Sequence, residues 1–183
     1  MRDDGMTLRN FAFIGPRGAG KSRLSRKFAK RLDRLLLSTD TLISYEAGGL
    51  PIRDIVAAEG WAGFREREYR LLEKVAGMPA VVIDCGGGIL VDVDADGSEY
   101  FSERKAALLR EKCTTIYLKR SVQWLLSREL DSSHRPTLAA DYEAVLRRRL
   151  PWYEKAADYV LDLSGRDVNE GIDELLFHFR DKS

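Results

Sequence analysis

Cysteine and histidine are scarce in this chain of 183 residues, which has two of each. Cys85 and Cys113 do not have the spacing of paired metal ligands, and two cysteines do not build a disulfide framework. The chain is therefore not a cysteine-rich secreted scaffold. We expect a protein of the reducing cytoplasm.

An excess of charge and a long hydrophobic run are also missing. The chain has 30 Lys and Arg against 29 Asp and Glu, so its net charge of +1 gives no reason to expect a nucleic acid or a membrane surface as a partner. No apolar run approaches the roughly 20 residues of a membrane span, and residues 1–6 lack the apolar stretch of a secretory signal. Apolar residues make up 44% of the chain, as in ordinary globular proteins. We expect residues 1–183 to form a single domain and a monomer.

Short apolar runs alternate with longer helical patterns, which predicts βα units, a parallel sheet and hence an α/β fold. The expected strands are residues 11–14, 35–37, 80–84, 115–118 and 159–163. The expected helices are residues 24–32, 55–75 with an interruption near Gly60, 106–111, 122–130, 142–156 and 172–179. Two polar segments fall outside this alternation. We expect residues 131–141 to form a mobile surface loop and residues 92–103 an inserted acidic turn.

A glycine-rich motif follows the first expected strand. Gly15, Gly20, Lys21 and Ser22 match the phosphate-loop pattern G-x-x-x-x-G-K-S without a gap. Glycines let backbone N–H groups converge on phosphate oxygens, and the following helix adds the positive end of its dipole. We expect Lys21 to reach the β and γ phosphates of ATP and the Ser22 hydroxyl to bind Mg²⁺, whereas a turn that binds nothing would not need this strand–helix context. The expected nucleotide contacts are Gly15, Arg17, Gly18, Ala19, Gly20, Lys21, Ser22 and Arg23.

An acidic residue ends the expected strand at 80–84. Phosphate-loop enzymes usually present such a carboxylate to the water shell of Mg²⁺, which makes Asp84 a candidate metal ligand, although a turn or a cap is the alternative. Gly86, Gly87 and Gly88 follow closely, and three consecutive glycines let a ligand approach the backbone. The end of this strand is therefore predicted to be part of the site.

In their order and spacing, these motifs resemble those of shikimate kinases. After the phosphate loop come Asp40, Arg65, the triple glycine, Arg135 followed by proline, and Arg149, and the resemblance runs from residue 11 to about residue 179. It implies a three-layer phosphate-loop kinase fold, with helices on both faces of a five-stranded parallel sheet ordered 2-3-1-4-5. It also implies a lid at about 131–141 and a substrate-binding helical region at about 40–75. The phosphate loop would lie at the carboxyl edge of the sheet, where ligands bind in such folds.

The resemblance further implies how an acceptor would be bound. Asp40 would bind the ring hydroxyls of shikimate and accept the proton of the reacting hydroxyl. Arg65 and Arg149 would each bind the substrate carboxylate, for which the planar guanidinium group is well suited. The three glycines at 86–88 would form the floor of the substrate pocket.

The implied reaction is transfer of the γ-phosphoryl group of ATP to the 3-hydroxyl of shikimate. Arg135 would close over the transferring phosphate and Arg128 would pack on adenine, so that Lys21, Asp40 and Arg135 are the expected catalytic residues. Three other readings stay open: a kinase for another small hydroxy acid such as gluconate, a nucleoside monophosphate kinase, and a relative that has lost catalysis. The two arginines favour an acceptor that carries a carboxylate.

Each matched residue also has an ordinary structural interpretation. Asp40 could cap the helix that begins near residue 42. Arg65 could pair with Glu68 on a solvated helix face. Arg149 ends a run of three arginines, of which two are expected to face solvent.

The chain departs from the shikimate kinase pattern at two positions. The family usually has Asp-x-Asp at the end of the second strand, where this chain has Ser38-Thr39-Asp40, and a small or hydroxyl residue where this chain has Asp84. We hypothesise that the carboxylate that supports Mg²⁺ has moved from the second strand to the third, since oxygen ligands from either strand end could serve. If it has not moved, its loss indicates a weakened or inactive relative.

Residues 92–103 match the calcium-loop pattern D-x-D-x-D-G-x5-E. An incoming helix and a second loop to pair with are both missing from the pattern. We therefore expect an acidic surface turn here rather than a calcium site.

Overall fold

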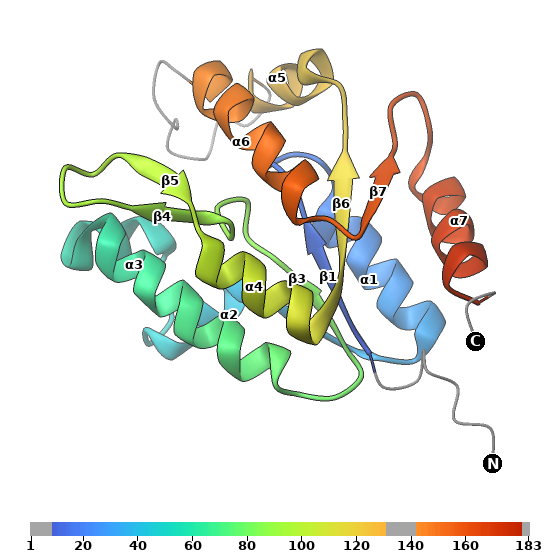
Figure 1. Ribbon diagram of the computed structural model, residues 1–183, viewed down its shortest axis with the longest axis horizontal. Helices are drawn as coiled ribbons and strands as arrows, with labels where there is room; N and C mark the ends of the chain where they lie inside the picture. The colour runs from blue at the N-terminus through green and yellow to red at the C-terminus, as the bar shows by residue number, and fades with distance from the viewer. Residues whose placement is uncertain (1–8, 131–141, 181–183) are drawn as a thin grey trace.

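The computed structural model describes residues 9–130 and 142–180, in which strands and helices alternate around a parallel sheet (Figure 1). The strands of this sheet are β1 (Asn10–Ile14), β2 (Leu35–Ser38), β3 (Val81–Asp84), β6 (Cys113–Lys119) and β7 (Tyr159–Asp162). The helices are α1 (Lys21–Leu32), α2 (Thr39–Glu46), α3 (Ile52–Ala76), α4 (Glu103–Lys112), α5 (Val122–Leu130), α6 (Tyr142–Ala156) and α7 (Val168–Arg180). The loop expected at 131–141 lies outside the described residues.

The strand order is β2-β3-β1-β6-β7, and all four pairings are parallel. Because β4 and β5 form a separate hairpin, β6 and β7 are the fourth and fifth strands of this sheet along the chain. The predicted order 2-3-1-4-5 is therefore confirmed. The central strand β1 lies between β3 and β6, so the loop after β1 and the residues after β3 meet at the same carboxyl edge of the sheet.

Helices cover both faces of the sheet, which gives two apolar cores. Figure 1 shows α1 and α7 on one side and α2, α3 and α4 on the other. Successive side chains of β1 point to opposite faces: Ala12 and Ile14 pack in the core under α3 and α4, while Phe11 and Phe13 pack in the core under α1 and α7. A strand buried on both faces has a continuous apolar sequence, which is why these runs were recognisable as strands.

Helix α3 contains the predicted interruption. Gly60 has φ 71° and ψ 172°, which are not helical values, so the helix kinks there. A positive φ costs glycine little because it has no Cβ. The kink separates the first turns of α3 from the longer segment that carries Arg65.

The segment at 92–103 forms a β-hairpin, so the expectation of a simple turn is wrong. Strand β4 (Val91–Val93) pairs antiparallel with β5 (Glu99–Phe101), and α4 begins two residues later. The Asp94 carboxylate accepts hydrogen bonds from the backbone N–H groups of Asp96 and Ser98, which closes the turn. Three-residue strands are too short to show an apolar alternation, and this is why the pattern did not reveal them.

Asp92, Asp94 and Glu103 of the calcium-loop pattern have other partners. Asp92 is buried and accepts hydrogen bonds from Ser102 and Arg104, while Glu103 pairs with Lys155. No group of three or more His, Cys, Asp and Glu side chains that could hold a metal ion occurs among residues 9–130 and 142–180. The carboxylates of Asp92 and Glu103 thus join the hairpin and the start of α4 to their neighbours.

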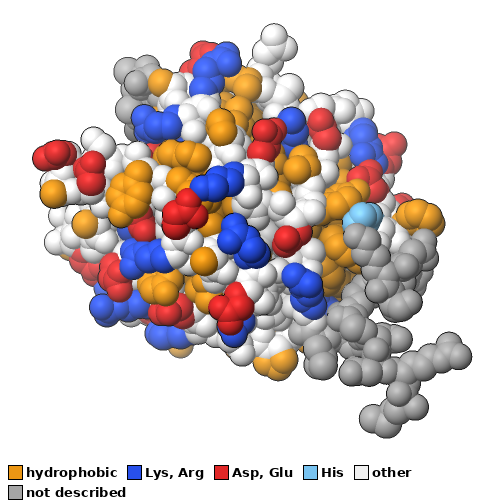
Figure 2. Space-filling view, in the orientation of Figure 1, with side chains coloured by type: hydrophobic (Ala, Val, Ile, Leu, Met, Phe, Trp, Pro, Cys, Tyr) orange, Lys and Arg blue, Asp and Glu red, His pale blue; other side chains and the backbone are white. Residues whose placement is uncertain are grey.

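The surface charges are mixed in sign, and both cysteines are buried and unpaired. On the face drawn in Figure 2, basic and acidic side chains are interspersed and do not gather by sign. Among the described helices, none combines the length and the apolar character needed to cross a membrane. Cys85 and Cys113 are buried free thiols, and burial raises the pKa of both, that of Cys113 to about 12.

Candidate active site

A cavity of about 1120 Å³ lies at the carboxyl edge of the sheet. It brings together the phosphate loop, the start of α2, the middle of α3, the glycine run after β3, and α6. The predicted site residues that line it are Arg17, Gly18, Gly20, Lys21, Ser22, Arg23, Asp40, Arg65, Asp84, Gly86, Gly87, Gly88 and Arg149.

Two predicted site residues that the structure describes do not line this cavity, and two others lie outside its described part. Gly15 and Ala19 belong to the phosphate loop but are buried beneath its surface. Arg128 belongs to α5, but its side chain lies outside the described part of the structure, as does the whole of Arg135.

The phosphate loop depends on glycine at three positions. Gly15, Gly18 and Gly20 have φ values of 140°, 80° and 98°, which disfavour any residue with a Cβ. A Cβ on Gly15 would also lie 2.9 Å from the backbone oxygen of Leu118 on β6. The loop ends where α1 begins, at Lys21. No acidic side chain in the first turn of α1 would repel an anion bound there.

Lys21 is the first residue of α1 and is largely buried. Its Nζ atom donates hydrogen bonds to the backbone oxygens of Gly15 at 2.9 Å and Pro16 at 3.0 Å, so the side chain folds over its own loop. Burial lowers the pKa of Lys21, while the nearby carboxylates of Asp84 and Asp40 oppose this shift. The lysine, the loop and the two carboxylates therefore form one electrostatic unit.

Asp40 lies in the first turn of α2 and is open to the cavity. No side-chain hydrogen bond caps this helix, so the interpretation of Asp40 as a cap is not supported. The neighbouring Thr39 instead accepts a hydrogen bond from the backbone N–H of Gly86 at 2.8 Å, which ties the start of α2 to the glycine run. Partial removal from water and the negative charge of Glu68 raise the pKa of Asp40, against the opposing charge of Lys21. A carboxylate with a raised pKa is suited to accept a proton.

The three glycines after β3 make room for three different groups. A Cβ on Gly86 would lie 2.3 Å from Oδ1 of Asp40, and one on Gly88 would lie 2.5 Å from Nη1 of Arg65. A Cβ on Gly87 would lie 3.1 Å from the backbone nitrogen of Arg17 in the phosphate loop. None of the three has a positive φ, so their need for glycine arises from close approach and not from backbone conformation.

We expect Gly88→Ala to lower kcat/KM for the acceptor about 100-fold, because the guanidinium of Arg65 would have to leave its place and displacements of about 1 Å are costly at an active site. Steady-state kinetics measure this effect. The matched control is Gly77→Ala, where the nearest atom to a new Cβ is 3.3 Å away and φ is −75°, and which should behave as the parent chain. An unchanged kcat/KM in Gly88→Ala would contradict the steric role.

Arg65 is buried and belongs to a chain of charged groups. Its Nη1 donates to Oε2 of Glu68 at 3.1 Å, and the same oxygen accepts from Nζ of Lys105 at 2.8 Å. Lys105, with 0% of its side chain exposed, also lies 3.2 Å from Oδ1 of Asp92. The interpretation of Arg65 as a residue of a solvated face is therefore wrong. Buried charges are stable only when they are paired, and this network pairs them.

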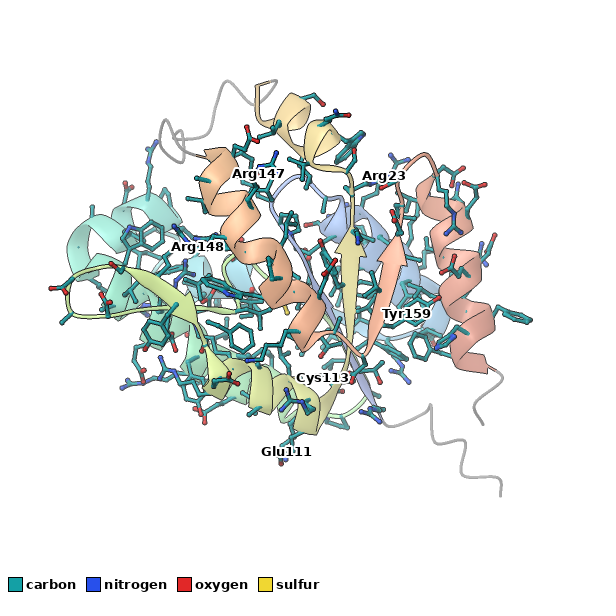
Figure 3. The ribbon with its side chains drawn as sticks, turned by 45° about the horizontal axis from the view of Figure 1, so that its top comes forward. Arg23, Glu111, Cys113, Arg147, Arg148 and Tyr159 are labelled. Atoms are coloured by element: carbon teal, nitrogen blue, oxygen red, sulfur yellow. The ribbon has the colours of Figure 1, made fainter. Side chains whose placement is uncertain are left out.

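Arg149 is the least exposed member of its arginine run. Only 12% of its side chain is exposed, whereas Arg147 and Arg148 are largely solvent-accessible, as expected. The Nε atom of Arg149 donates to Oε2 of Glu99 at 3.0 Å, and its Nη2 donates to Oε1 of the same residue. Arg148 also pairs with Glu99, and Figure 3 shows Arg148 on the side of α6 that faces the hairpin.

Asp84 has an unused oxygen in a buried position. Oδ1 is buried and makes no hydrogen bond with any described residue, although an orphaned carboxylate oxygen is costly. In the sheet, Asp84 lies opposite Ser38 of β2, so the two positions that depart from the family pattern are direct neighbours. Asp84 and Ser22 both line the cavity, and their oxygen donors fit Mg²⁺, which needs few protein ligands when phosphates complete its shell.

Several residues of the site carried no recognisable signal in the sequence. Tyr153 donates from its hydroxyl to the backbone oxygen of Gly87, and the ring of Trp61 lies 5.2 Å from the guanidinium carbon of Arg65. Lys105 and Glu99 do not line the cavity, but they hold Glu68 and Arg149 from segments far along the chain. Thr39 could have been found, since it stands directly before Asp40.

Sequence comparisons with known proteins point to the same family as the residues of the site. A model of the shikimate kinase family matches residues 17–179. The shikimate kinase of Leptospira biflexa is 40% identical over 171 residues, which cover 92% of this chain and 94% of that protein. The shikimate kinase of Syntrophus aciditrophicus is 33% identical over 181 residues, covering 94% of this chain and 91% of that protein.

Solved structures give the same result. A shikimate kinase from Acinetobacter baumannii in complex with shikimate superposes with a TM-score of 0.82 and 27% identity, covering 97% of this chain and 96% of that one. The fold is shared as well with a shikimate kinase from Aquifex aeolicus, with a TM-score of 0.74, 22% identity and coverage of 94% and 97%. The chain belongs to the shikimate kinase family.

Proposed function

We propose that this chain transfers the γ-phosphoryl group of ATP to the 3-hydroxyl of shikimate, giving shikimate 3-phosphate and ADP. The observation that carries the proposal is one cavity lined by a phosphate loop, by Asp40, by the buried Arg65 and by the partly buried Arg149. The solved relative from Acinetobacter baumannii binds shikimate. Cytoplasmic location and a monomeric state remain predictions.

The acceptor carboxylate is bound by Arg65 and Arg149. Each arginine is fixed by a carboxylate of its own, Glu68 or Glu99, which leaves guanidinium donors for a ligand. Two such groups can hold a small acid in one orientation, because the planar fork matches a carboxylate. This arrangement favours a carboxylate-bearing ring alcohol over a neutral sugar.

Asp40 accepts the proton of the reacting hydroxyl. As that oxygen forms its bond to the γ-phosphorus of ATP, the bond from phosphorus to the β–γ bridging oxygen breaks and ADP leaves. Lys21 and the N–H groups of the phosphate loop hold the phosphates, and Arg135 is proposed to neutralise the charge of the transferred group. Arg128 is proposed to pack on the adenine.

Mg²⁺ is the proposed cofactor, and Ser22 and Asp84 are the residues that would hold it. The chemistry that Mg²⁺ supplies when bound is neutralisation of phosphate charge. The orphaned oxygen of Asp84 supports this assignment, since a partner for it is otherwise lacking among the described residues. Asp84 would thus replace the carboxylate that the family usually carries at the position of Ser38.

We expect Asp84→Ser to raise the Mg²⁺ concentration needed for half-maximal activity about tenfold or more, because a carboxylate ligand is lost. Calorimetry should show a matching loss in the Mg²⁺ dependence of ADP binding. The decisive companion is the exchange variant Ser38→Asp with Asp84→Ser, which should recover the Mg²⁺ response because it restores the family arrangement. An Mg²⁺ dependence that is unchanged in Asp84→Ser would reject the assignment.

A coupled ADP-release assay tests the proposed activity itself. The purified chain is offered shikimate, gluconate and nucleoside monophosphates in turn, with ATP and Mg²⁺. Turnover with shikimate alone is the expected result. Turnover with gluconate or a monophosphate instead would reject the acceptor, and binding without turnover would identify a relative that has lost catalysis.

A further inference from the structure

The β4–β5 hairpin is connected to both arginines that are proposed to bind the acceptor carboxylate. Its first strand supplies Asp92, which pairs with Lys105 and so connects to Glu68 and Arg65. Its second strand supplies Glu99, which pairs with Arg149 on α6. The hairpin does not line the cavity itself. Its two strands therefore act on the site through other side chains.

The contact between Glu99 and Arg149 uses only one edge of the guanidinium group. Glu99 accepts from Nε and Nη2, which is the side-on edge. The end-on edge, made by Nη1 and the second hydrogen of Nη2, makes no hydrogen bond to any residue of 9–130 and 142–180. Arg149 lines the cavity, so this edge is available to a second carboxylate.

We propose that Glu99 is a positioning residue, which holds Arg149 so that its end-on edge receives the carboxylate of the acceptor. The inference rests on the proposed function, since it assumes an acceptor acid in this cavity. Glu99 has the same relation to Arg149 that Glu68 has to Arg65. Each carboxylate fixes one arginine, and N–H donors of that arginine remain available to a ligand.

The alternative role for Glu99 is that of a competitor, which would occupy Arg149 until the acceptor displaces it. A competitor would have to block the donors that the ligand carboxylate uses, and Glu99 leaves the end-on edge of Arg149 unoccupied. Arg148 also donates to Glu99, so two arginines hold the carboxylate in place and its displacement would break both contacts. Both observations favour positioning.

Glu99 remains ionised in this setting. Partial burial disfavours its charged form, but hydrogen bonds from Arg149 and Arg148 outweigh the burial and lower the pKa of Glu99. It therefore keeps its charge across the neutral range, and the pair with Arg149 is charge-assisted.

The test is Glu99→Gln, which keeps the size of the side chain but removes its charge and the bidentate contact. We expect KM for shikimate to rise about tenfold, from the loss of a charge-assisted hydrogen bond, with kcat changed less than about twofold. Titration followed by tryptophan fluorescence, with Trp61 in the cavity wall, gives the binding constant directly. The methyl ester of shikimate, which lacks the negative charge, should bind the parent chain and Glu99→Gln with nearly the same affinity.

The matched control is Glu103→Gln. Glu103 pairs with Lys155 of α6 at 2.5 Å, so this variant also removes an ion pair between the hairpin region and α6, but one that does not touch the cavity. Its KM should equal that of the parent chain. An unchanged KM for shikimate in Glu99→Gln, an equal loss with the methyl ester, or a lowered KM would each overturn the proposal, the last by making Glu99 a competitor. Failure of the parent chain to phosphorylate shikimate would instead reject the proposed function.

Discussion

Asp40→Asn should lower kcat about 1000-fold, the largest effect on turnover that we expect from a single substitution. The amide keeps the size of the side chain and much of its hydrogen bonding to ring hydroxyls, but it cannot accept the proton of the attacking hydroxyl. KM for shikimate should therefore change much less than kcat. Steady-state kinetics with saturating ATP measure both constants.

The pH profile provides an independent check on Asp40. Partial removal from water and neighbouring negative charge place the pKa of Asp40 above its ordinary value of 3.8. Because the base must be ionised, kcat/KM of the parent chain should fall as the pH drops through this raised pKa, at a higher pH than for an ordinary aspartate. The residual activity of Asp40→Asn should lack this acidic limb. An identical limb in both proteins would assign the titration to another group.

Lys105→Met should lower the free energy of unfolding by about 3–5 kcal/mol, because it removes one partner from a buried network and leaves the carboxylates of Glu68 and Asp92 without their shared cation. Methionine fills a similar volume, so the loss would come from charge and not from a cavity. Denaturant unfolding followed by circular dichroism measures it. Weakened binding of shikimate should accompany the loss, since Glu68 also holds Arg65.

Lys112→Met is the control for this prediction. Lys112 lies on the same helix and pairs with Glu111, but both side chains are exposed, with 45% and 67% accessible. Exposed pairs contribute about 0–1 kcal/mol, so this variant should be nearly as stable as the parent chain. Equal stabilities of Lys105→Met and the parent chain would show that the network is not needed for folding.

The sheet and most helices could be predicted because their signals are local. The strands are continuous apolar runs, and the helices repeat apolar residues at helical spacing, as Leu24 and Phe28 do in α1. The β4–β5 hairpin could not be predicted, because its strands are short and acidic side chains interrupt their apolar positions. Asp92, one of these acidic residues, is buried only because Lys105 and Arg104 neutralise it.

The candidate site was predictable where its residues stand in motifs. Most of the phosphate loop, Asp40, Arg65 and the triple glycine line the same cavity. The residues that support them were mostly not predictable, because Lys105 lies 37 positions from Glu68 and Glu99 lies 50 positions from Arg149. Glu68 was the exception, since it stands three positions from Arg65 on one helix, where such pairs are ordinary.

The pairing of Ser38 with Asp84 across β2 and β3 has a consequence for how such enzymes diverge. Side chains that lie opposite each other on adjacent parallel strands share one small region of space, although 46 positions separate them along the chain. A negative charge can therefore pass from one strand to its neighbour by two substitutions, without any change in the backbone. An alignment made position by position shows two departures from the family pattern. The pair of neighbouring positions on β2 and β3 nevertheless keeps one negative charge.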